Sequence, residues 1–393
     1  MIKVALVRGK YLNNFEGQNF LFPKDKIRLT AISSLQPLHQ KFPFPVIKLP
    51  SLADLGRGPI LQRLIKIIAN RTLGDSQILF GLESYASKFD IFHTADPHYY
   101  YSYQLACLRA NNLIKKLIVT SWETIPFNNE ETKRKASIKK FTQQVADMFI
   151  CYTQKAKKTL IEEGVNEKKI KRVRLGVDLK KFKVKNQKLK IEKKSLTIMF
   201  VGRLVEEKGI MDLYEAYKNI KYQISIPQLV GKNINQKLKI LGTHLKIVGD
   251  GPLKNEIKTM IKRDSLDDFV AIEQKSYEEM PKVYQQADIL VVPSKRTKTW
   301  EEQYGMVLVE ALASGLPIIA YDTGAISEVL GGVGLLVKEG DIDGLTSSII
   351  YLLKNKNLRE KLGRMGRERA EKEFDSKKTA KKIQEIYYDV IRY

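Results

Sequence analysis

Short apolar segments rich in β-branched residues recur along the chain, separated by charged segments with helical spacing. Nine of them are predicted as strands, at residues 2–7, 90–94, 116–122, 148–153, 196–203, 245–251, 289–294, 317–322 and 334–337. Strands that alternate with helices in this way are typical of parallel α/β sheets. The pattern therefore predicts an α/β protein built from doubly wound parallel sheets.

The alternation breaks within residues 180–195, which are rich in lysine and poor in large apolar side chains. A new strand, glycine loop and helix follow directly, so we predict an interdomain linker at residues 183–195. The two domains are then residues 1–182 and 196–373. Residues 374–393 end the chain in a predicted amphipathic helix, because Ile383, Ile386, Tyr387 and Ile391 share one face.

Loops that follow the strands are the expected place for ligands, because open α/β sheets bind them beyond the carboxyl ends of the strands. With two such domains, the cleft between them is the default site. Gly202 and Arg203 follow the strand that begins the second domain, and Lys208 precedes the next helix. Two cations near a helix N-terminus suit a diphosphate. The alternative is a surface arginine and lysine that flank a turn.

The loop after residues 245–248 carries Gly249 and Gly251 before a helix. Without side chains there, a nucleobase or ribose can approach the backbone, although a plain strand–turn–helix corner explains the glycines equally well.

A third loop leads into "EEQYGMVLVEALASG", residues 301–315. Gly305 is expected to precede a buried helix, whose first amides are then free to face an anion. Glu302 lies in the loop and Glu310 in the second turn, and each carboxylate can accept two hydroxyl hydrogen bonds from a sugar. The alternative for Glu310 is a buried ion pair with Arg203 or Lys208.

These segments resemble the retaining glycosyltransferases of family 4. That family has two glutamates separated by seven residues, as Glu302 and Glu310 are, followed by small residues and a "G-x-P" turn. "VGRLVEEKG", "IVGDGPL", "YQQADILVVPS" and "YDTGAISEVL" match the family in order and spacing. The resemblance is strong over residues 196–340 and looser before residue 170. It implies the GT-B fold, in which two Rossmann-like domains face a central cleft and the terminal helix packs back on the acceptor-binding first domain.

The resemblance also implies a role for each matching residue. Arg203 and Lys208 bind the donor diphosphate and stabilise the departing nucleotide, while Glu302 contacts the donor sugar; these are the implied catalytic residues. Donor binding is implied for Gly202, Gly249, Tyr304, Gly305, Met306, Val307 and Glu310, where Glu310 holds the ribose and Gly249 borders the base. The donor is a UDP- or GDP-sugar. Neither metal nor cofactor is expected, because two cations and a helix N-terminus can neutralise the leaving diphosphate.

The first half departs from the family pattern. Its first loop lacks a Gly-Gly pair, and Trp122 stands where the family often has a histidine. "HTADPHYYYSYQ", residues 93–104, follows a strand and is expected to contact the acceptor rather than a metal. The acceptor-side candidates are Gly9, Asn14, His93, Asp96, His98 and Trp122.

The net charge of the chain is +24 and is unevenly distributed. Residues 1–185 hold 33 basic and 15 acidic side chains, a net +18, whereas residues 186–393 have a net +6. Such an excess favours anionic partners, which are nucleic acid, acidic lipid at an anionic membrane surface, or phosphorylated substrates. A general bias towards lysine is the alternative, but it would not concentrate the charge in one half. Nucleic acid is disfavoured, because no aromatic platform or zinc spacing accompanies the charge.

Residues 60–71 are one candidate for the membrane contact, since Arg63, Lys66 and Arg71 lie among Ile and Leu. An ordinary helix packed on the core is the alternative. No apolar run is long enough to span a membrane, and the N-terminus is too short and charged for a signal peptide. Cys107 and Cys151 show neither metal nor redox spacing, as expected in a reducing compartment.

The sequence thus predicts a retaining glycosyltransferase that moves a sugar from a nucleotide sugar to a lipid-linked acceptor or a cell-surface glycan precursor. It is expected in the cytoplasm, peripheral on the inner face of the cell membrane. Another GT-B enzyme, such as a nucleotide-sugar epimerase or a sugar phosphorylase, is the alternative.

Overall fold

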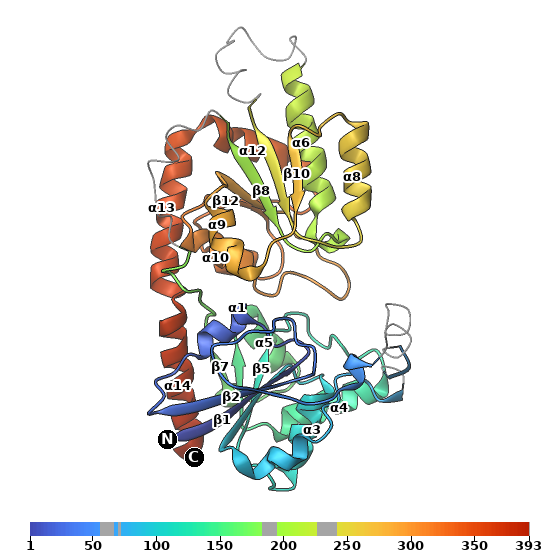
Figure 1. The fold of residues 1–393 in the computed structure, drawn as a ribbon, viewed down its shortest axis with the longest axis vertical. Helices are drawn as coiled ribbons and strands as arrows, with labels where there is room; N and C mark the ends of the chain where they lie inside the picture. Colours follow the sequence, from blue (N-terminus) through green and yellow to red (C-terminus); the bar gives the residue numbers. More distant parts are fainter. Residues whose placement is uncertain (56–66, 70–71, 183–194, 226–241, 393) are drawn as a thin grey trace. The chain divides into compact units, whose positions relative to one another are not determined.

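The computed structural model describes residues 1–55, 67–69, 72–182, 195–225 and 242–392 (Figure 1). Nearly all of the predicted linker, and Arg63, Lys66 and Arg71 of the predicted membrane-contacting segment, lie outside the described residues. The chain divides into two compact units. Unit 1 comprises Met1–Gly176 and Ser376–Tyr393, and unit 2 comprises Val177–Asp375.

Unit 1 is built on a seven-stranded parallel sheet in the order β3-β2-β1-β4-β5-β6-β7. Its strands are β1 (Ile2–Gly9), β2 (Ile27–Ser33), β3 (Val46–Lys48), β4 (Ile91–Ala95), β5 (Leu117–Ser121), β6 (Met148–Cys151) and β7 (Ile170–Arg172). Its helices are α1 (Asn14–Gly17), α3 (Tyr100–Ala110), α4 (Lys133–Val145), α5 (Gln154–Glu162) and α14 (Ser376–Arg392). Short 3₁₀ segments are η1 (Gln18–Phe20), η2 (Leu52–Asp54), η3 (Leu82–Lys88) and η4 (Glu167–Lys169).

Unit 2 is built on a six-stranded parallel sheet in the order β10-β9-β8-β11-β12-β13. Its strands are β8 (Thr197–Val201), β9 (His244–Val248), β10 (Val270–Glu273), β11 (Ile289–Val292), β12 (Ile318–Tyr321) and β13 (Leu335–Val337). Its helices are α6 (Ile210–Ser225), α8 (Lys254–Arg263), α9 (Met280–Tyr284), α10 (Met306–Ala313), α11 (Ile326–Leu330), α12 (Ile342–Lys354) and α13 (Lys356–Glu373). The 3₁₀ segments are η6 (Glu206–Lys208) and η7 (Tyr277–Glu279).

In both sheets the strand order reverses once, between β1 and β4 in unit 1 and between β8 and β11 in unit 2. This is the strand order of the Rossmann fold, and ligands of such sheets bind where the order reverses. The reversal points therefore direct attention to the loops after β1 and β4 and after β8 and β11.

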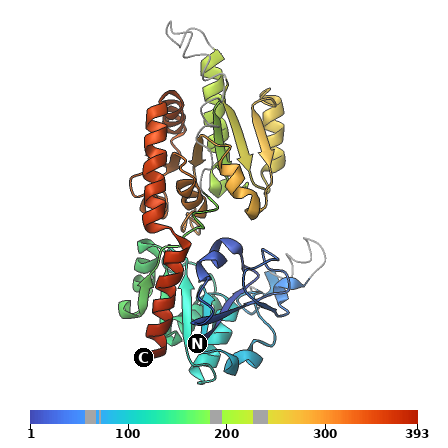
Figure 2. The same cartoon turned by 60° about the vertical axis from the view of Figure 1, so that its left-hand side comes forward.

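Helices cover both faces of each sheet, so the strands are buried as continuous apolar runs (Figures 1 and 2). The C-terminal helix α14 is part of unit 1 and buries Ile383, Ile386, Tyr387 and Val390. Ile391, which the spacing assigned to the apolar face, is 38% exposed, and Val390 takes its place because it lies one turn after Ile386.

The predicted doubly wound α/β architecture is confirmed, and all nine predicted strands are present. Four strands were missed, β2, β3, β7 and β10. Three of them lie at sheet edges, are three or four residues long and include charged side chains such as Lys48 and Arg172. β2 alternates buried Ile27 and Leu29 with exposed Arg28, so it lacks the continuous apolar run that marks its neighbours.

Candidate functional site

The loops after β8 and β11 touch at the reversal point of unit 2. Gly209 ends the first loop with φ +65°, and a Cβ at this position would lie 1.8 Å from the carbonyl oxygen of Pro293 in the second. Only glycine permits both the backbone conformation and the contact. The close approach of the two loops brings Lys208 to the segment that carries Glu302.

Lys208 and Glu302 form an ion pair in which Nζ lies 2.7 Å from Oε2. The Ser294 hydroxyl donates a hydrogen bond to the same carboxylate oxygen at 2.8 Å. The side chains of Lys208 and Glu302 are 19% and 9% exposed. The structure therefore brings together a predicted phosphate-binding cation and a predicted sugar-binding carboxylate, and leaves the lysine partly open to solvent.

Trp300 is a residue of this site that the sequence reasoning missed. Its ring centroid lies 4.5 Å from Nζ of Lys208, a cation–π distance. The ring and Glu302 together fix the direction of the ammonium group. A tryptophan two residues before Glu302, in a loop otherwise made of Lys, Arg and Thr, was the signal available in the sequence.

Arg203 lies apart from this pair in the described contacts. Its side chain is 64% exposed, and Nη2 lies 3.2 Å from Oε1 of Glu207 on the same loop. An exposed pair of this kind contributes little free energy, so a bound anion can replace Glu207 at small cost.

Gly202 and Gly249, at the ends of β8 and β9, are in backbone contact. A Cβ on Gly249 would lie 1.8 Å from the carbonyl oxygen of Gly202. The contact alone explains why a side chain is excluded at residue 249, so proximity to a nucleobase stays a prediction.

The helix predicted after Gly305 is confirmed as α10. Gly305 is its N-cap with φ 76°, and its carbonyl accepts a hydrogen bond from the Leu308 amide at 2.8 Å. Met306 and Val307 open the helix and are half-buried, while Tyr304 is buried. The first amides of a helix lack partners within the helix and are suited to anions.

Glu310 lies in the second turn of α10, as predicted, and is 4% exposed. Its Oε2 accepts a hydrogen bond from the Tyr284 hydroxyl at 2.8 Å. Burial raises the pKa of Glu310 to about 7, and the Tyr284 hydrogen bond only partly opposes this. The alternative of an ion pair with Arg203 or Lys208 is wrong, because those cations contact Glu207 and Glu302 instead.

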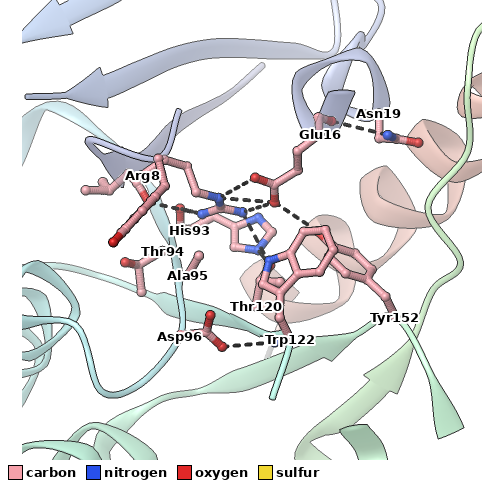
Figure 3. Close-up of polar contacts among 12 residues, drawn as sticks. Arg8, Glu16, Asn19, His93, Thr94, Ala95, Asp96, Thr120, Trp122 and Tyr152 are labelled. Atoms are coloured by element: carbon pink, nitrogen blue, oxygen red, sulfur yellow. Dashed lines mark hydrogen bonds and ion pairs between the residues drawn. The ribbon is translucent and has the colours of Figure 1, made fainter. Parts of the chain in front are cut away.

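Asp96 follows β4 at the reversal point of unit 1 (Figure 3). Its φ of +43° falls in the left-handed region, which aspartate tolerates better than most residues. Its Oδ1 accepts a hydrogen bond from the Trp122 amide at 2.9 Å, and burial raises the pKa of Asp96 to about 7 against the effect of that bond. The structure thus brings together two acceptor-side candidates, Asp96 and Trp122.

His93 lies on β4 and is fully buried. Its Nδ1 lies 2.7 Å from the Tyr387 hydroxyl of α14, and its Nε2 lies 2.7 Å from Oγ1 of Thr120. Figure 3 shows His93 and Thr120. Burial and the charge of Arg8 hold the pKa of His93 well below its usual value, so the ring is neutral. Both ring nitrogens are bonded, and direct contact with an acceptor would require these bonds to break.

A buried ion pair beside His93 was also missed. Arg8, at the end of β1, is 1% exposed and lies 2.9 Å from Glu16 through Nη2, with Nε within 3.1 Å of both carboxylate oxygens. The Tyr152 hydroxyl donates to Glu16 at 3.0 Å, and Nη1 of Arg8 donates to the His93 carbonyl at 3.0 Å (Figure 3). Burial alone would lower the pKa of Arg8, but Glu16 raises it. An arginine ending the first apolar run was the available signal.

Aromatic rings gather near the remaining acceptor-side candidates. The ring of His98 lies 4.3 Å from that of Tyr99, which lies 5.3 Å from Tyr101. A Cβ on Gly9 would lie 2.8 Å from the Tyr101 ring, so the glycine leaves room for the ring. The Tyr101 hydroxyl is buried without a hydrogen-bond partner in the described structure.

Asn14, at the start of α1, contacts a different part of unit 1. Its side-chain amide donates to the Lys41 carbonyl at 2.9 Å, and its backbone amide donates to Nδ1 of His39 at 2.8 Å. These bonds tie α1 to the segment after β2.

Among the described residues, no three His, Cys, Asp or Glu side chains are grouped so that they could hold a metal ion. None of the described helices is both long and apolar enough to cross a bilayer.

Known protein families account for most of the chain. A model described as Glycosyltransferase Family 4 matches residues 38–181, and one described as Glycosyl transferases group 1 matches residues 181–369. The N-acetyl-alpha-D-glucosaminyl L-malate synthase of Bacillus anthracis is 29% identical over 48% of this chain and 47% of its own length. The capsular polysaccharide biosynthesis glycosyltransferase CapM of Staphylococcus aureus is 29% identical over 54% and 52%. The chain thus spans about half the length of the curated relatives it matches.

Solved structures with the same fold include Anabaena HepE (Alr3699). Its crystal structure in complex with UDP has a TM-score of 0.71 and 16% identity, and covers 99% of this chain and 100% of that one. A complex of HepE with UDP-glucose gives the same TM-score. At this identity the likeness establishes the fold, and it confirms the predicted GT-B fold.

Proposed function

Since this chain belongs to the family 4 type of glycosyltransferases and has their GT-B fold, we propose that it transfers a sugar from a nucleotide sugar to an acceptor hydroxyl with retention of the anomeric configuration. The observation that carries the proposal is the Lys208–Glu302 pair at the reversal point of unit 2, which joins the loop after β8 to the loop that leads into α10. It offers a cation for a phosphate and a carboxylate for sugar hydroxyls within one contact.

The donor-side roles follow from the charges of these groups. Lys208 and Arg203 neutralise the diphosphate as it leaves, together with the amides that open α10. Glu302 accepts hydrogen bonds from the donor sugar once Lys208 turns to the phosphate. Glu310 accepts the ribose hydroxyls, which favours its ionised form. The donor is a UDP- or GDP-sugar, and the UDP-glucose complex of HepE supports the uridine donors.

The acceptor side is unit 1. Asp96 is held by the Trp122 amide and follows β4, which places a carboxyl group where ligands of such sheets bind. The neighbouring His98 and Tyr99 offer rings that can pack on a sugar face. We propose a lipid-linked acceptor or a cell-surface glycan precursor, which the name of CapM supports.

We propose that the enzyme acts at the anionic surface of the inner face of the cell membrane. The support is the net +18 of residues 1–185. Basic residues near an anionic bilayer contribute about 1 kcal/mol each.

Transfer is proposed to need no metal, because the cations of the protein neutralise the leaving group. Excess chelator should leave the rate near its full value. Strict dependence on Mn²⁺ or Mg²⁺ would contradict this mechanism.

The experiment that tests the function is a screen of nucleotides and donors. UDP or GDP should raise the melting temperature of the protein. One of the corresponding nucleotide sugars should be slowly hydrolysed when no acceptor is present. Failure of every nucleotide to bind would overturn the proposal. The epimerase or phosphorylase alternative is not favoured, because the matched families are transferases. An epimerised free nucleotide sugar, or a sugar phosphate formed from glycan and phosphate, would revive it.

A further inference from the structure

A groove of about 780 Å³ runs along α4 on unit 1, with Tyr103 of α3 on its wall. Figure 1 shows α3 and α4 in unit 1. Lys133, Arg134 and Lys140 line the groove together with Phe141, and none of the described residues in the lining is acidic. The Tyr103 and Phe141 rings meet edge to face with centroids 5.6 Å apart. The groove therefore combines several cations with an aromatic surface.

Helix α4 carries five basic residues and no acidic one. Three of the basic residues line the groove, and the other two lie elsewhere on the helix. Lys135 is paired with Glu131 at 2.9 Å. Lys139 is buried, with Glu163 at 2.5 Å and Glu130 at 2.9 Å. The cations that pair with carboxylates thus lie away from the groove.

The groove face keeps its charge. Lys133 and Lys140 are exposed and pair with no carboxylate of the described structure. They are seven residues apart, which places them on one face about 10 Å from each other along the helix. Arg134 donates through Nε to the Leu73 carbonyl at 3.1 Å, so its guanidinium has nitrogens left for another acceptor.

We propose that this groove is a docking site for the phosphate headgroups of anionic phospholipids, so that the α3–α4 face of unit 1 lies against the membrane. Lysine and arginine supply the attraction to phosphate. The tyrosine and phenylalanine rings supply apolar area at the depth where aromatic side chains sit in a bilayer interface. This docking site rests on the membrane location proposed above and assigns the membrane contact to the α3–α4 face. It does not depend on residues 60–71.

Vesicle co-sedimentation tests the proposal with the full chain at low salt. The protein should pellet with phosphatidylglycerol vesicles and poorly with phosphatidylcholine vesicles. The K133Q/K140Q variant should partition about 30-fold more weakly, the equivalent of about 2 kcal/mol for two basic residues. The matched control is K258Q/K262Q, which removes the same charge from exposed positions of α8 in unit 2 and should change partition less than about threefold.

The result that would overturn the proposal is an equal loss in both variants, since net charge alone would then account for binding. Equal binding to both vesicle types, or none to either, would overturn it too. Binding to an RNA duplex that only K133Q/K140Q loses, with vesicle binding unchanged, would assign the groove to nucleic acid instead.

A nucleotide measurement separates this surface from the transfer reaction. The stabilisation of K133Q/K140Q by UDP or GDP should equal that of wild type. If no nucleotide binds wild type while the vesicle result holds, the proposed transfer fails and the docking surface stands.

Discussion

The two reversal points of the molecule hold ion pairs of opposite character. In unit 2, Lys208 and Glu302 are 19% and 9% exposed, so a ligand can take the place of either partner. In unit 1, Arg8 and Glu16 are 1% and 4% exposed, and further bonds to His93 and Tyr152 surround them. Replacing either partner there means dismantling the interior. Burial rather than charge therefore separates a pair suited to ligand exchange from one that holds the ends of central strands β1 and β4 in place.

The largest expected effect comes from breaking the buried pair. Arg8→Met leaves the Glu16 carboxylate buried without its cation, which should lower the free energy of unfolding of unit 1 by about 3–5 kcal/mol. Lys208→Met in unit 2 should cost under about 1 kcal/mol, because its pair is partly exposed and Ser294 still donates to Glu302. Urea unfolding measures both. Trp122 and Trp300 are the two tryptophans of the chain, one in each unit. In a Trp300→Phe background the fluorescence of Trp122 reports the unfolding of unit 1, and in a Trp122→Phe background that of Trp300 reports the unfolding of unit 2.

The double variant Arg8→Met/Glu16→Leu sharpens this test. It removes both charges and should be more stable than Arg8→Met alone, because no uncompensated carboxylate remains. Two results would contradict the distinction between the two pairs. One is a loss of unfolding free energy in the double variant equal to the sum of the two single losses, and the other is an equal loss of unfolding free energy for Arg8→Met and Lys208→Met.

The sequence indicated the local surroundings of the unit 2 candidates better than those of the unit 1 candidates, for a physical reason. Gly209 directly precedes α6, Glu302 lies in the loop that leads into α10, and Glu310 lies in the second turn of α10, so local pattern indicates their surroundings. Arg8 pairs with Glu16 eight residues away, but its further bonds reach His93 and Thr120, 85 and 112 residues away, and His93 reaches Tyr387 across 294 residues. The Lys208–Glu302 contact of unit 2 likewise spans 94 residues. No local pattern specifies such contacts.

The same limit applies to elements and to single side chains. Central strands such as β8 and β11 were predicted because they are apolar on both faces, whereas the short edge strands β3, β7 and β10 contain charged side chains and lack a continuous apolar run. Glu310 was rightly placed in a buried turn, but its hydrogen bond to Tyr284 of α9 depends on how two helices pack, which spacing does not specify.

The second prediction concerns Glu310→Gln and pH. Burial raises the pKa of Glu310 from 4.5 to about 7, so the folded protein keeps a proton that the unfolded chain releases between these values. The contribution of this group to stability is full below pH 4.5, falls as the pH rises to about 7 and stays low above it. A shift of this size corresponds to about 3 kcal/mol. Thermal unfolding at pH 5 and pH 8 should therefore show the variant gaining stability relative to wild type as the pH rises.

The ribose role of Glu310 needs a separate readout. If Glu310 binds ribose, Glu310→Gln should weaken nucleoside diphosphate binding at pH 8 even while it stabilises the fold. Unchanged nucleotide affinity with the same stability profile would leave Glu310 as a buried group without a donor role.

The third prediction concerns the exchangeable pair itself. Lys208→Ala should fold and lose about 10- to 150-fold in transfer rate, because one charge-assisted hydrogen bond to the leaving diphosphate contributes about 1.5–3 kcal/mol. Lys262→Ala, an exposed lysine of α8 in the same unit, serves as control and should match wild type. Transfer by Lys208→Ala within twofold of wild type would remove Lys208 from the site.

The smallest expected effect tests whether Trp300 positions Lys208. Trp300→Leu keeps apolar bulk but removes the ring face 4.5 Å from the ammonium, so the lysine should sample more directions. A cation–π contact of this exposure contributes about 1 kcal/mol, which predicts a fall in kcat of about fivefold with little change in donor KM. Trp300→Phe retains a ring and should recover most of the rate, which a purely structural role in the loop would not require. Equal rates for the Leu and Phe variants would show that the ring does not position Lys208 and that Glu302 alone does. The cation of unit 2 would then be held by its carboxylate, as Arg8 is held by Glu16 in unit 1.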